Sequence, residues 1–238
     1  MVSDYTALDL ETTGLNPKRD KIIEIGAVKV RDGKVVERFQ SFVDPGRRLE
    51  ENIRELTGIG NGMLEGAPDM GQLLEPLLAF LGDDVLVGHR ILFDYSFVKK
   101  EAVNRGIVFE RKGIDTLKLA RKFLPDLESR KLEYLCRHYG LEHTAHRALG
   151  DAQAASELYL KLTGLFCGGN NGGEGGKDFE PQPLVYRVKK ETPVTKSQKE
   201  RLYKLLDKHK ITMECQVEKL TRNEADRIMN QIFAAYGR

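Results

Sequence analysis

Two carboxylates at the end of an apolar segment are the feature that most restricts how this chain can fold. Residues 2–8 can form a buried strand, and Asp9 and Glu11 follow two positions apart in the stretch LDLETTGL. Side chains at positions i and i+2 of a strand project from the same face, so both acids should point the same way. Two like charges held together beside a core are unfavourable unless a partner neutralises them. The sequence therefore predicts a positively charged partner at this point.

Three more polar residues stand where the fold could bring them to the same place. Asp94 follows the predicted strand 85–88 and opens a helix, and Asp151 lies in the first turns of the helix predicted after His146. Carboxylate oxygens suit hard divalent cations, Mg²⁺ or Mn²⁺, better than zinc. Two such ions, roughly 3.5–4 Å apart, can stabilise the attacking and departing oxygens of a phosphodiester. The predicted partner is therefore a pair of divalent metal ions, and the predicted substrate is a phosphate ester.

The hydrophobic pattern predicts an α/β fold, a mixed sheet flanked by helices. Residues 22–42 form two β-rich runs around Asp32-Gly33, a strong hairpin signal, and should lie antiparallel beside the first strand. Asp115 fits the N-cap of a helix better than a catalytic role. Helical spacing is found in four later segments, which are 93–106, 115–125, 130–140 and 146–162.

A change in composition separates the chain into parts. Residues 167–183 are rich in Gly and Asn and close with two prolines, which is typical of a flexible linker. Their Gly-Lys pair does not make a phosphate-binding loop, because Asn171 and Asp178 stand where that motif needs Gly and Ser or Thr. We therefore expect an α/β domain over residues 1–166, a linker over 167–183 and a small basic helical unit over 184–238.

The net charge of +2 conceals an asymmetry between these parts. Residues 184–238 hold 13 Lys and Arg against 7 Asp and Glu, so they carry +6 and residues 1–183 carry −4. A basic unit behind an acidic domain predicts an anionic partner, with ordinary solvated surface charge as the alternative. The capping boxes TKSQ (195–198) and TRNE (221–224) should each start a helix. The two helices weakly resemble short T-x-x-Q…L-T-x-x-E-A tails of other bacterial proteins, which indicates no particular function.

The number and spacing of the cysteines and the hydropathy of the chain indicate its cellular compartment. Cys136, Cys167 and Cys215 are odd in number and widely spaced, which favours reduced thiols over a disulfide framework. No stretch is long and apolar enough to span a bilayer, and no signal peptide is recognisable. We therefore expect a cytoplasmic protein with no membrane partner. One group of Cys and His residues does not have the spacing of a structural zinc site: Cys136, His138, His143 and His146.

Three motifs in order give the chain a specific resemblance. The stretches LDLETTGL, GHRILFDYSFV and HRALGDAQAA resemble the three motifs of the DEDDh 3′→5′ exonucleases, the family of the proofreading epsilon subunit of bacterial replicative polymerases. The pieces IIEIGAVKV, ELTGI and IDTLKLARKFLP resemble the sequence between those motifs, and the resemblance runs from about Ser3 to about Leu165. A single D-x-E would be weak support, whereas three motifs with His five residues before the last Asp are specific.

The resemblance implies a ribonuclease-H-like fold and a role for each acid. Asp9 would contact both metal ions, Glu11 and Asp151 would complete the site of one ion, and Asp94 would help to hold the other. His146 would be the general base, because an imidazole with a pKa of about 6.5 accepts a proton near neutral pH. The product would be a 5′-mononucleotide.

Residues beside the acids are candidates for substrate contact. The turn after the catalytic strand could meet the terminal nucleotide through its backbone N–H groups, Leu15 could wedge against the base, and Phe93 could stack on it. Ordinary turn formation and core packing are the alternatives. Arg90 stands where the family commonly has Asn, and it could contact a phosphate or extend into solvent. The full set of candidates is Leu10, Thr12, Thr13, Gly14, Leu15, Arg90 and Phe93.

The resemblance fixes the type of reaction better than the type of nucleic acid. The main prediction is an exonuclease that trims single-stranded or frayed DNA 3′ ends during proofreading or repair, with a DNA polymerase or another replication protein as a candidate partner. An RNA-trimming or oligoribonuclease-type enzyme is one alternative. A catalytically silent adaptor that binds nucleic acid or a polymerase is another, which the presence of all five motif residues disfavours.

Overall fold

The computed structural model describes residues 2–143, 147–167, 176–213 and 216–237, and it divides into two compact units. The first unit comprises Met1–Pro45 and Leu49–Arg187. The second comprises Gly46–Arg48 and Val188–Arg238.

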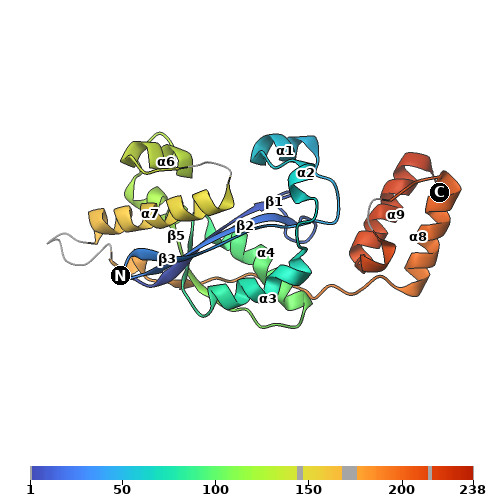
Figure 1. The fold of residues 1–238 in the computed structure, drawn as a ribbon, viewed down its shortest axis with the longest axis horizontal. Coiled ribbons are helices and arrows are strands. Elements are labelled where there is room, and N and C mark those ends of the chain that lie inside the picture. Colours follow the sequence, from blue (N-terminus) through green and yellow to red (C-terminus); the bar gives the residue numbers. More distant parts are fainter. Residues whose placement is uncertain (1, 144–146, 168–175, 214–215, 238) are drawn as a thin grey trace. The chain divides into compact units, whose positions relative to one another are not determined.

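A six-stranded mixed sheet forms the centre of the first unit (Figure 1). The strand order is β3-β2-β1-β4-β5-β6, with β1–β4 and β4–β5 parallel and the other neighbours antiparallel. The strands are β1 (Tyr5–Thr12), β2 (Ile22–Arg31), β3 (Lys34–Phe42), β4 (Leu86–Gly88), β5 (Lys112–Asp115) and β6 (Gln182–Pro183). The predicted mixed sheet is therefore confirmed.

The hairpin between β2 and β3 turns where the sequence predicts it. Asp32 and Gly33 have φ angles of 48° and 71°. Positive φ at both central residues is the geometry that matches the twist of two-residue hairpins, and Asp-Gly is among the pairs that adopt it most readily.

The first strand is longer than the hydrophobic run alone predicted. β1 continues to Thr12 because it pairs with β2 beyond Leu8, with Asp9 opposite Gly26 and Glu11 opposite Glu24. The two acids are therefore part of the strand instead of following it, and the ladder holds their backbone rigid.

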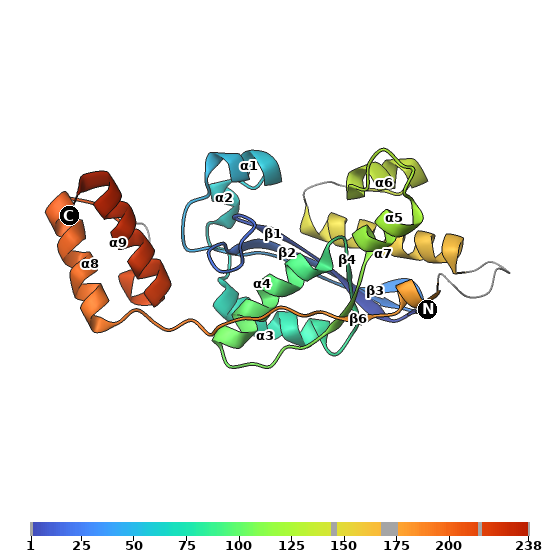
Figure 2. The ribbon, with the colours of Figure 1, turned by 180° about the vertical axis from the view of Figure 1, so that it is seen from behind.

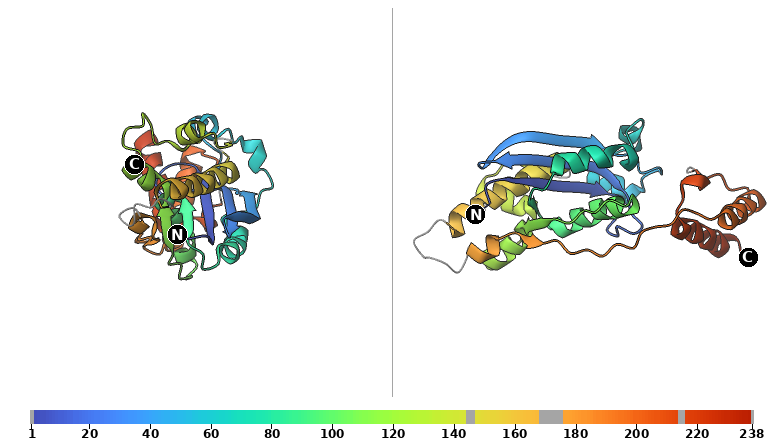
Figure 3. Two further views of the ribbon diagram at one scale, coloured as in Figure 1. Left: turned by 90° about the vertical axis from the view of Figure 1, so that its left-hand side faces the viewer. Right: turned by 90° about the horizontal axis from the view of Figure 1, so that it is seen from below.

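Helices cover both faces of the sheet. α7 (Ala148–Phe166) packs on one face, and α3 (Met70–Leu81) and α4 (Ile91–Asn104) pack on the other; Figure 3 shows the strands between these layers. The side chains of β1 alternate accordingly, with Tyr5 and Ala7 in the core under α7 and Leu8 and Leu10 in the core under α3 and α4.

Shorter helices complete the first unit. They are α1 (Glu51–Thr57), α2 (Asn61–Leu64), α5 (Thr116–Phe123) and α6 (Leu132–Tyr139). Asp115 caps α5 as predicted, because its carboxylate accepts hydrogen bonds from the backbone N–H groups of Leu117 and Lys118. Cys136, on α6, and Cys167 are free thiols, and burial raises the pKa of Cys136 to about 11.

The first unit extends past the boundary expected at residue 166, as the orange segment of Figure 2 shows. A 3-10 turn, η1 (Gly176–Phe179), places Phe179 in the core under α7, and β6 pairs with β5. Leu184 packs so closely over Gly113 that a Cβ there would lie 2.8 Å from the leucine Cδ1. The expected linker is therefore structured over 176–183, because Phe179 and Leu184 anchor it. Residues 168–175 lie outside the described part of the chain.

The second unit contains two capped helices around its own small core. α8 (Lys196–His209) and α9 (Arg222–Tyr236) start at Thr195 and Thr221, and both capping boxes form as predicted. A 3-10 turn, η2 (Val217–Lys219), joins them in sequence. None of the helices that the structure describes has the length and apolar character needed to cross a membrane.

Candidate active site

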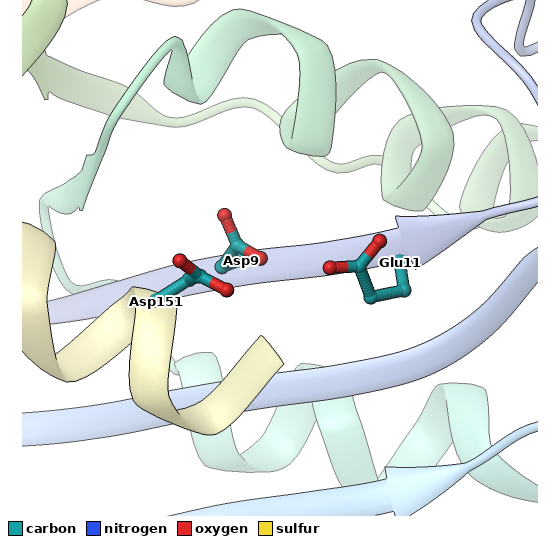
Figure 4. A group of neighbouring side chains, drawn as sticks. All are labelled: Asp9, Glu11 and Asp151. Carbon is teal, nitrogen blue, oxygen red and sulfur yellow. The ribbon is translucent and has the colours of Figure 1, made fainter. Parts of the chain in front are cut away.

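Three carboxylates from two elements converge on the face of the sheet that α7 covers. Asp9 and Glu11 project from β1, and Asp151 projects from the first turn of α7 (Figure 4). Each offers one oxygen, and these oxygens all lie within 4.8 Å of one another. The strand spacing and the helix predicted from sequence therefore bring these acids to one point.

The fourth acid reaches the site from α4. Asp94 is only 3% exposed, and its Oδ1 accepts a hydrogen bond of 3.0 Å from the backbone N–H of Leu10. This bond fixes the carboxylate beside β1, one residue from Asp9.

Burial and mutual repulsion favour the protonated forms of three of these acids, Asp9, Glu11 and Asp94. Burial, followed by the carboxylates of Asp94 and Asp151, raises the pKa of Asp9 well above its usual range. Burial also raises the pKa of Asp94 well above its usual range, against the effect of the Leu10 N–H. Burial, then Asp151 and Glu24, raises the pKa of Glu11 to about 7. Carboxylates in this condition are expected to release protons when cations bind.

The donor set fits hard divalent cations. Among the described residues, the group close enough to hold an ion consists of Asp9, Glu11 and Asp151, so its ligand atoms are all carboxylate oxygens. Oxygen-only anionic sites favour Mg²⁺ or Mn²⁺, whereas structural zinc sites use thiolates and imidazoles.

The predicted general base, His146, lies outside the described residues. The structure instead shows a different imidazole at the site, because Nε2 of His143 lies 2.6 Å from Oδ1 of Asp151. Sequence analysis predicted no role for His143 at this site, because its only signal was a Cys/His group without the spacing of a metal site.

A cleft of about 250 Å³ opens over the acids, and four of the predicted substrate-contact residues line it. Leu10 and Phe93 form part of its wall, and Leu15 is 76% exposed at its edge. The Arg90 guanidinium lies 5.7 Å from the centre of the Phe93 ring. Arg90 also has a left-handed backbone, with φ 80° and ψ 39°, and its N–H donates to Oδ1 of Asp115.

The other three candidates, Thr12 at the end of β1 and Thr13 and Gly14 in the turn that follows, are not among the described residues that line the cleft. The Thr12 hydroxyl donates to the carbonyl of Gly14, and the Thr13 hydroxyl accepts from the backbone N–H of Lys21. A Cβ at Gly14 would lie 2.5 Å from Oδ2 of Asp20, so the Asp20 carboxylate packs directly against this glycine. Their contact with substrate stays a prediction.

Two further residues line the cleft and carried no site prediction, His89 and Leu132. Nε2 of His89 lies 2.9 Å from the carbonyl of Arg130, and Nδ1 lies 2.9 Å from the hydroxyl of Thr116. A carbonyl only accepts, so Nε2 carries the proton and Nδ1 can accept from the hydroxyl. Burial lowers the pKa of His89, which favours this neutral form. His89 thus connects the start of α4 to α5 and to the loop that precedes α6.

Comparisons with known proteins agree with this geometry. The model of the RNase_T family, described as Exonuclease, matches residues 6–159. The DNA polymerase III subunit epsilon of Aquifex aeolicus is 38% identical over 160 residues, which cover 66% of this chain and 79% of that protein. A PolC-type DNA polymerase III of Clostridium perfringens is 42% identical over 156 residues, which cover 65% of this chain but only 11% of that polymerase.

Solved structures share the fold at lower sequence identity. Exonuclease I has a TM-score of 0.61 at 19% identity, with 69% of this chain and 41% of that chain covered. Exonuclease X in complex with 5′ overhanging duplex DNA has a TM-score of 0.54 at 24% identity, with 72% and 95% covered. With the family model matched over most of the first unit, the acids of its motifs in one cleft and the predicted fold observed, this chain belongs to the exonuclease family.

Proposed function

We propose that this protein is a metal-dependent 3′→5′ exonuclease that releases 5′-mononucleotides from DNA ends. The observation that carries the proposal is the convergence of Asp9, Glu11 and Asp151 within 4.8 Å, in a cleft that Asp94 also lines. A silent adaptor would have no use for four carboxylates whose burial and repulsion oppose folding.

These residues would divide the work of hydrolysis among themselves. Asp9 would contact both of two Mg²⁺ or Mn²⁺ ions, Glu11 and Asp151 would complete one site, and Asp94 would support the other. Bound ions supply charge neutralisation for the attacking and departing oxygens. His146 would accept the proton of the attacking water.

The lining of the cleft suggests how the terminal nucleotide is held. Phe93 and the exposed Leu15 offer apolar surfaces to a base, and Arg90 offers a guanidinium to a phosphate. The phosphate role of Arg90 is favoured by its position at the start of α4, where its side chain also contacts the Phe93 ring.

DNA is the proposed substrate because of the relatives. Two curated relatives are DNA polymerase III proteins, and structures of Exonuclease I and Exonuclease X contain DNA. On the same basis we propose single-stranded or frayed 3′ ends as the substrate, a replication polymerase as the partner and the cytoplasm as the location.

The direct test is hydrolysis by the full chain in Mg²⁺. End-labelled DNA and RNA oligomers would be supplied with each end blocked in turn. We expect mononucleotides from DNA with a free 3′ end, no product when that end is blocked, and none in chelator. Faster release from RNA would reassign the substrate, and release from the 5′ end would overturn the proposal.

A further inference from the structure

A fifth carboxylate lies beside the metal-binding acids and is held by an arginine. Glu24, on β2, is completely buried and stands directly opposite Glu11. Its Oε1 lies 2.8 Å from the Nη2 atom of Arg147, and Nε of Arg147 lies 3.2 and 3.3 Å from the two carboxylate oxygens. Like charges directly opposite each other destabilise a sheet, so this arginine offsets an unfavourable pair.

The arginine is itself fixed by the edge strand. The Arg147 guanidinium lies 5.2 Å from the centre of the Phe42 ring, and Nε2 of Gln40 donates to Oε1 of Glu24. Two residues of β3 therefore hold the pair. A planar guanidinium that is both paired and stacked has few alternative orientations.

The same pair binds the beginning of α7. The backbone N–H of Ala148 donates to Oε2 of Glu24 at 3.2 Å, and the backbone N–H of Arg147 donates to Oδ2 of Asp151 at 3.1 Å. Arg147 makes no side-chain cap of its own at this helix start. Glu24 on β2 thus provides the hydrogen-bond acceptor that the N-cap side chain of a helix normally provides.

Glycine brings the helix close enough for these bonds. A Cβ at Gly26 would lie 2.1 Å from the backbone carbon of Ala148, so α7 rests directly on the β2 backbone. Gly26 lies opposite Asp9 and shares a face with Glu24. The contact therefore sits next to the metal-binding acids.

We propose that Glu24, Arg147 and Gly26 form a clamp that fixes the first turn of α7 and so positions Asp151 for metal binding. Glu24 and Arg147 are positioning residues in this proposal, since they act through Asp151. The metal-binding part rests on the proposed function, whereas the clamping of α7 does not.

A simple effect of charge predicts a different outcome, which makes the proposal testable. If Glu24 and Arg147 acted only through their electric field, Glu24→Gln would weaken cation binding and Arg147→Met would strengthen it. A clamp predicts that both substitutions weaken binding, by about the 10–100-fold that is usual for residues that orient a ligand. The double variant should then lose little more than either single variant, because each single change already opens the clamp.

The experiment uses the full chain and Mn²⁺ as the probe. Mn²⁺ affinity would be measured by calorimetry for the parent, the two single variants and the double variant. The matched control is Glu37→Gln, which removes a glutamate paired to Lys29 at 3.4 Å on the same sheet, on the exposed strand β3. Opposite signs for the two single variants, or a loss equal to that of the control, would overturn the metal-positioning part.

Hydrogen exchange tests the clamp without reference to metal. In chelator, Glu24→Gln and Arg147→Met should speed the exchange of amides in the first turns of α7 and leave those of α4 unchanged. Unchanged exchange in α7 would overturn the clamp even if the enzyme were active. Failure of the parent to bind Mn²⁺ would overturn the proposed function, while the exchange result would still decide the clamp.

Discussion

The two units of this protein differ in what they bury. In the first unit, Glu24, Asp94, Lys99 and Lys100 are buried, and burial raises the pKa of Asp9 and Asp94 well above the usual range. In the described part of the second unit every buried residue is apolar, and both helices begin with capping boxes. Buried charged groups with shifted pKa values are typical of a functional site. Where helix caps and an apolar core both favour the same fold, the segment folds stably, but this agreement says little about its function.

Removal of Asp9 should have the largest effect on the first unit. Asp9→Ala should abolish Mg²⁺-dependent hydrolysis, because this carboxylate is proposed to contact both ions, while the fold persists. It should not lower the melting temperature in chelator, since it relieves repulsion among the acids. Mononucleotide release and a thermal melt would check both statements. Retained hydrolysis would show that the site is elsewhere.

Removal of the predicted base should have the next largest effect. His146→Ala should lower the rate by roughly 10²–10⁴-fold, the usual contribution of general-base catalysis, and leave metal affinity nearly unchanged. Hydroxide can replace a missing base, so the rate deficit should narrow as pH rises. His143→Ala is the matched comparison, since the structure places that imidazole at Asp151. If His143→Ala lowered the rate of hydrolysis more than His146→Ala, His143 and not His146 would be the general base.

Removal of the second unit tests whether its charge has a function. Residues 188–238 carry 12 Lys and Arg against 7 Asp and Glu. The truncation should follow Arg187, because Leu184 belongs to the core of the first unit. It should spare hydrolysis of saturating short DNA but weaken binding of longer strands. Each lost phosphate contact should reduce the log–log salt slope by roughly 0.7.

Candidate contacts in that unit include Lys189, Lys190, Lys196, Lys199 and Lys204. An identical salt slope with and without the second unit would reject nucleic-acid binding by it. Capture of purified replication proteins by the isolated unit would then test protein docking.

The pH dependence of stability measures how unfavourable it is to hold the ionised Glu11 carboxylate beside the other acids of the first unit. The pKa of Glu11 is raised from 4.5 to about 7, so between these values the folded state holds a proton that the unfolded state has lost. Stability in chelator should therefore fall as pH rises through this window. The melting temperature of the parent should therefore fall relative to that of Glu11→Gln as pH rises from about 4.5 to about 7, and Mg²⁺ should raise the parent's melting temperature more at pH 7 than at pH 5. A parent that gained stability relative to Glu11→Gln over this range would contradict the assignment.

The smallest effect is expected at Arg90, whose left-handed backbone suits Asn better than Arg. Arg90→Asn should raise the free energy of unfolding by about 1 kcal/mol. It should also raise KM by a few-fold through loss of a phosphate contact, with kcat little changed. Arg90→Gln loses the same charge without the backbone benefit, so it should raise KM equally and leave stability unchanged. An unaltered KM in both variants would show that Arg90 does not hold substrate.

Local patterns in the sequence were sufficient to predict much of the fold and to identify the four acids that line the cleft. The Asp32-Gly33 turn, the Asp115 cap and both capping boxes were predicted because each depends on residues within a few positions. Asp9 and Glu11 share a face because the strand period is two. The family motifs named Asp94 and Asp151 in advance, and the structure places both at the cleft. The role of His146 stays a prediction.

Tertiary structure alone decided the contacts between distant segments. Glu24 and Arg147 are 123 positions apart, and no short pattern in the sequence joins them. Composition placed Phe179 in a linker and Leu184 in the basic helical unit, whereas both side chains pack into the core of the first unit. From the sequence alone, Glu24 and Gly26 are predicted only as strand residues. Their contact with α7 is seen only in the tertiary structure. Short-range periodicity specifies which face a side chain takes, but the partner on that face depends on how the whole chain packs.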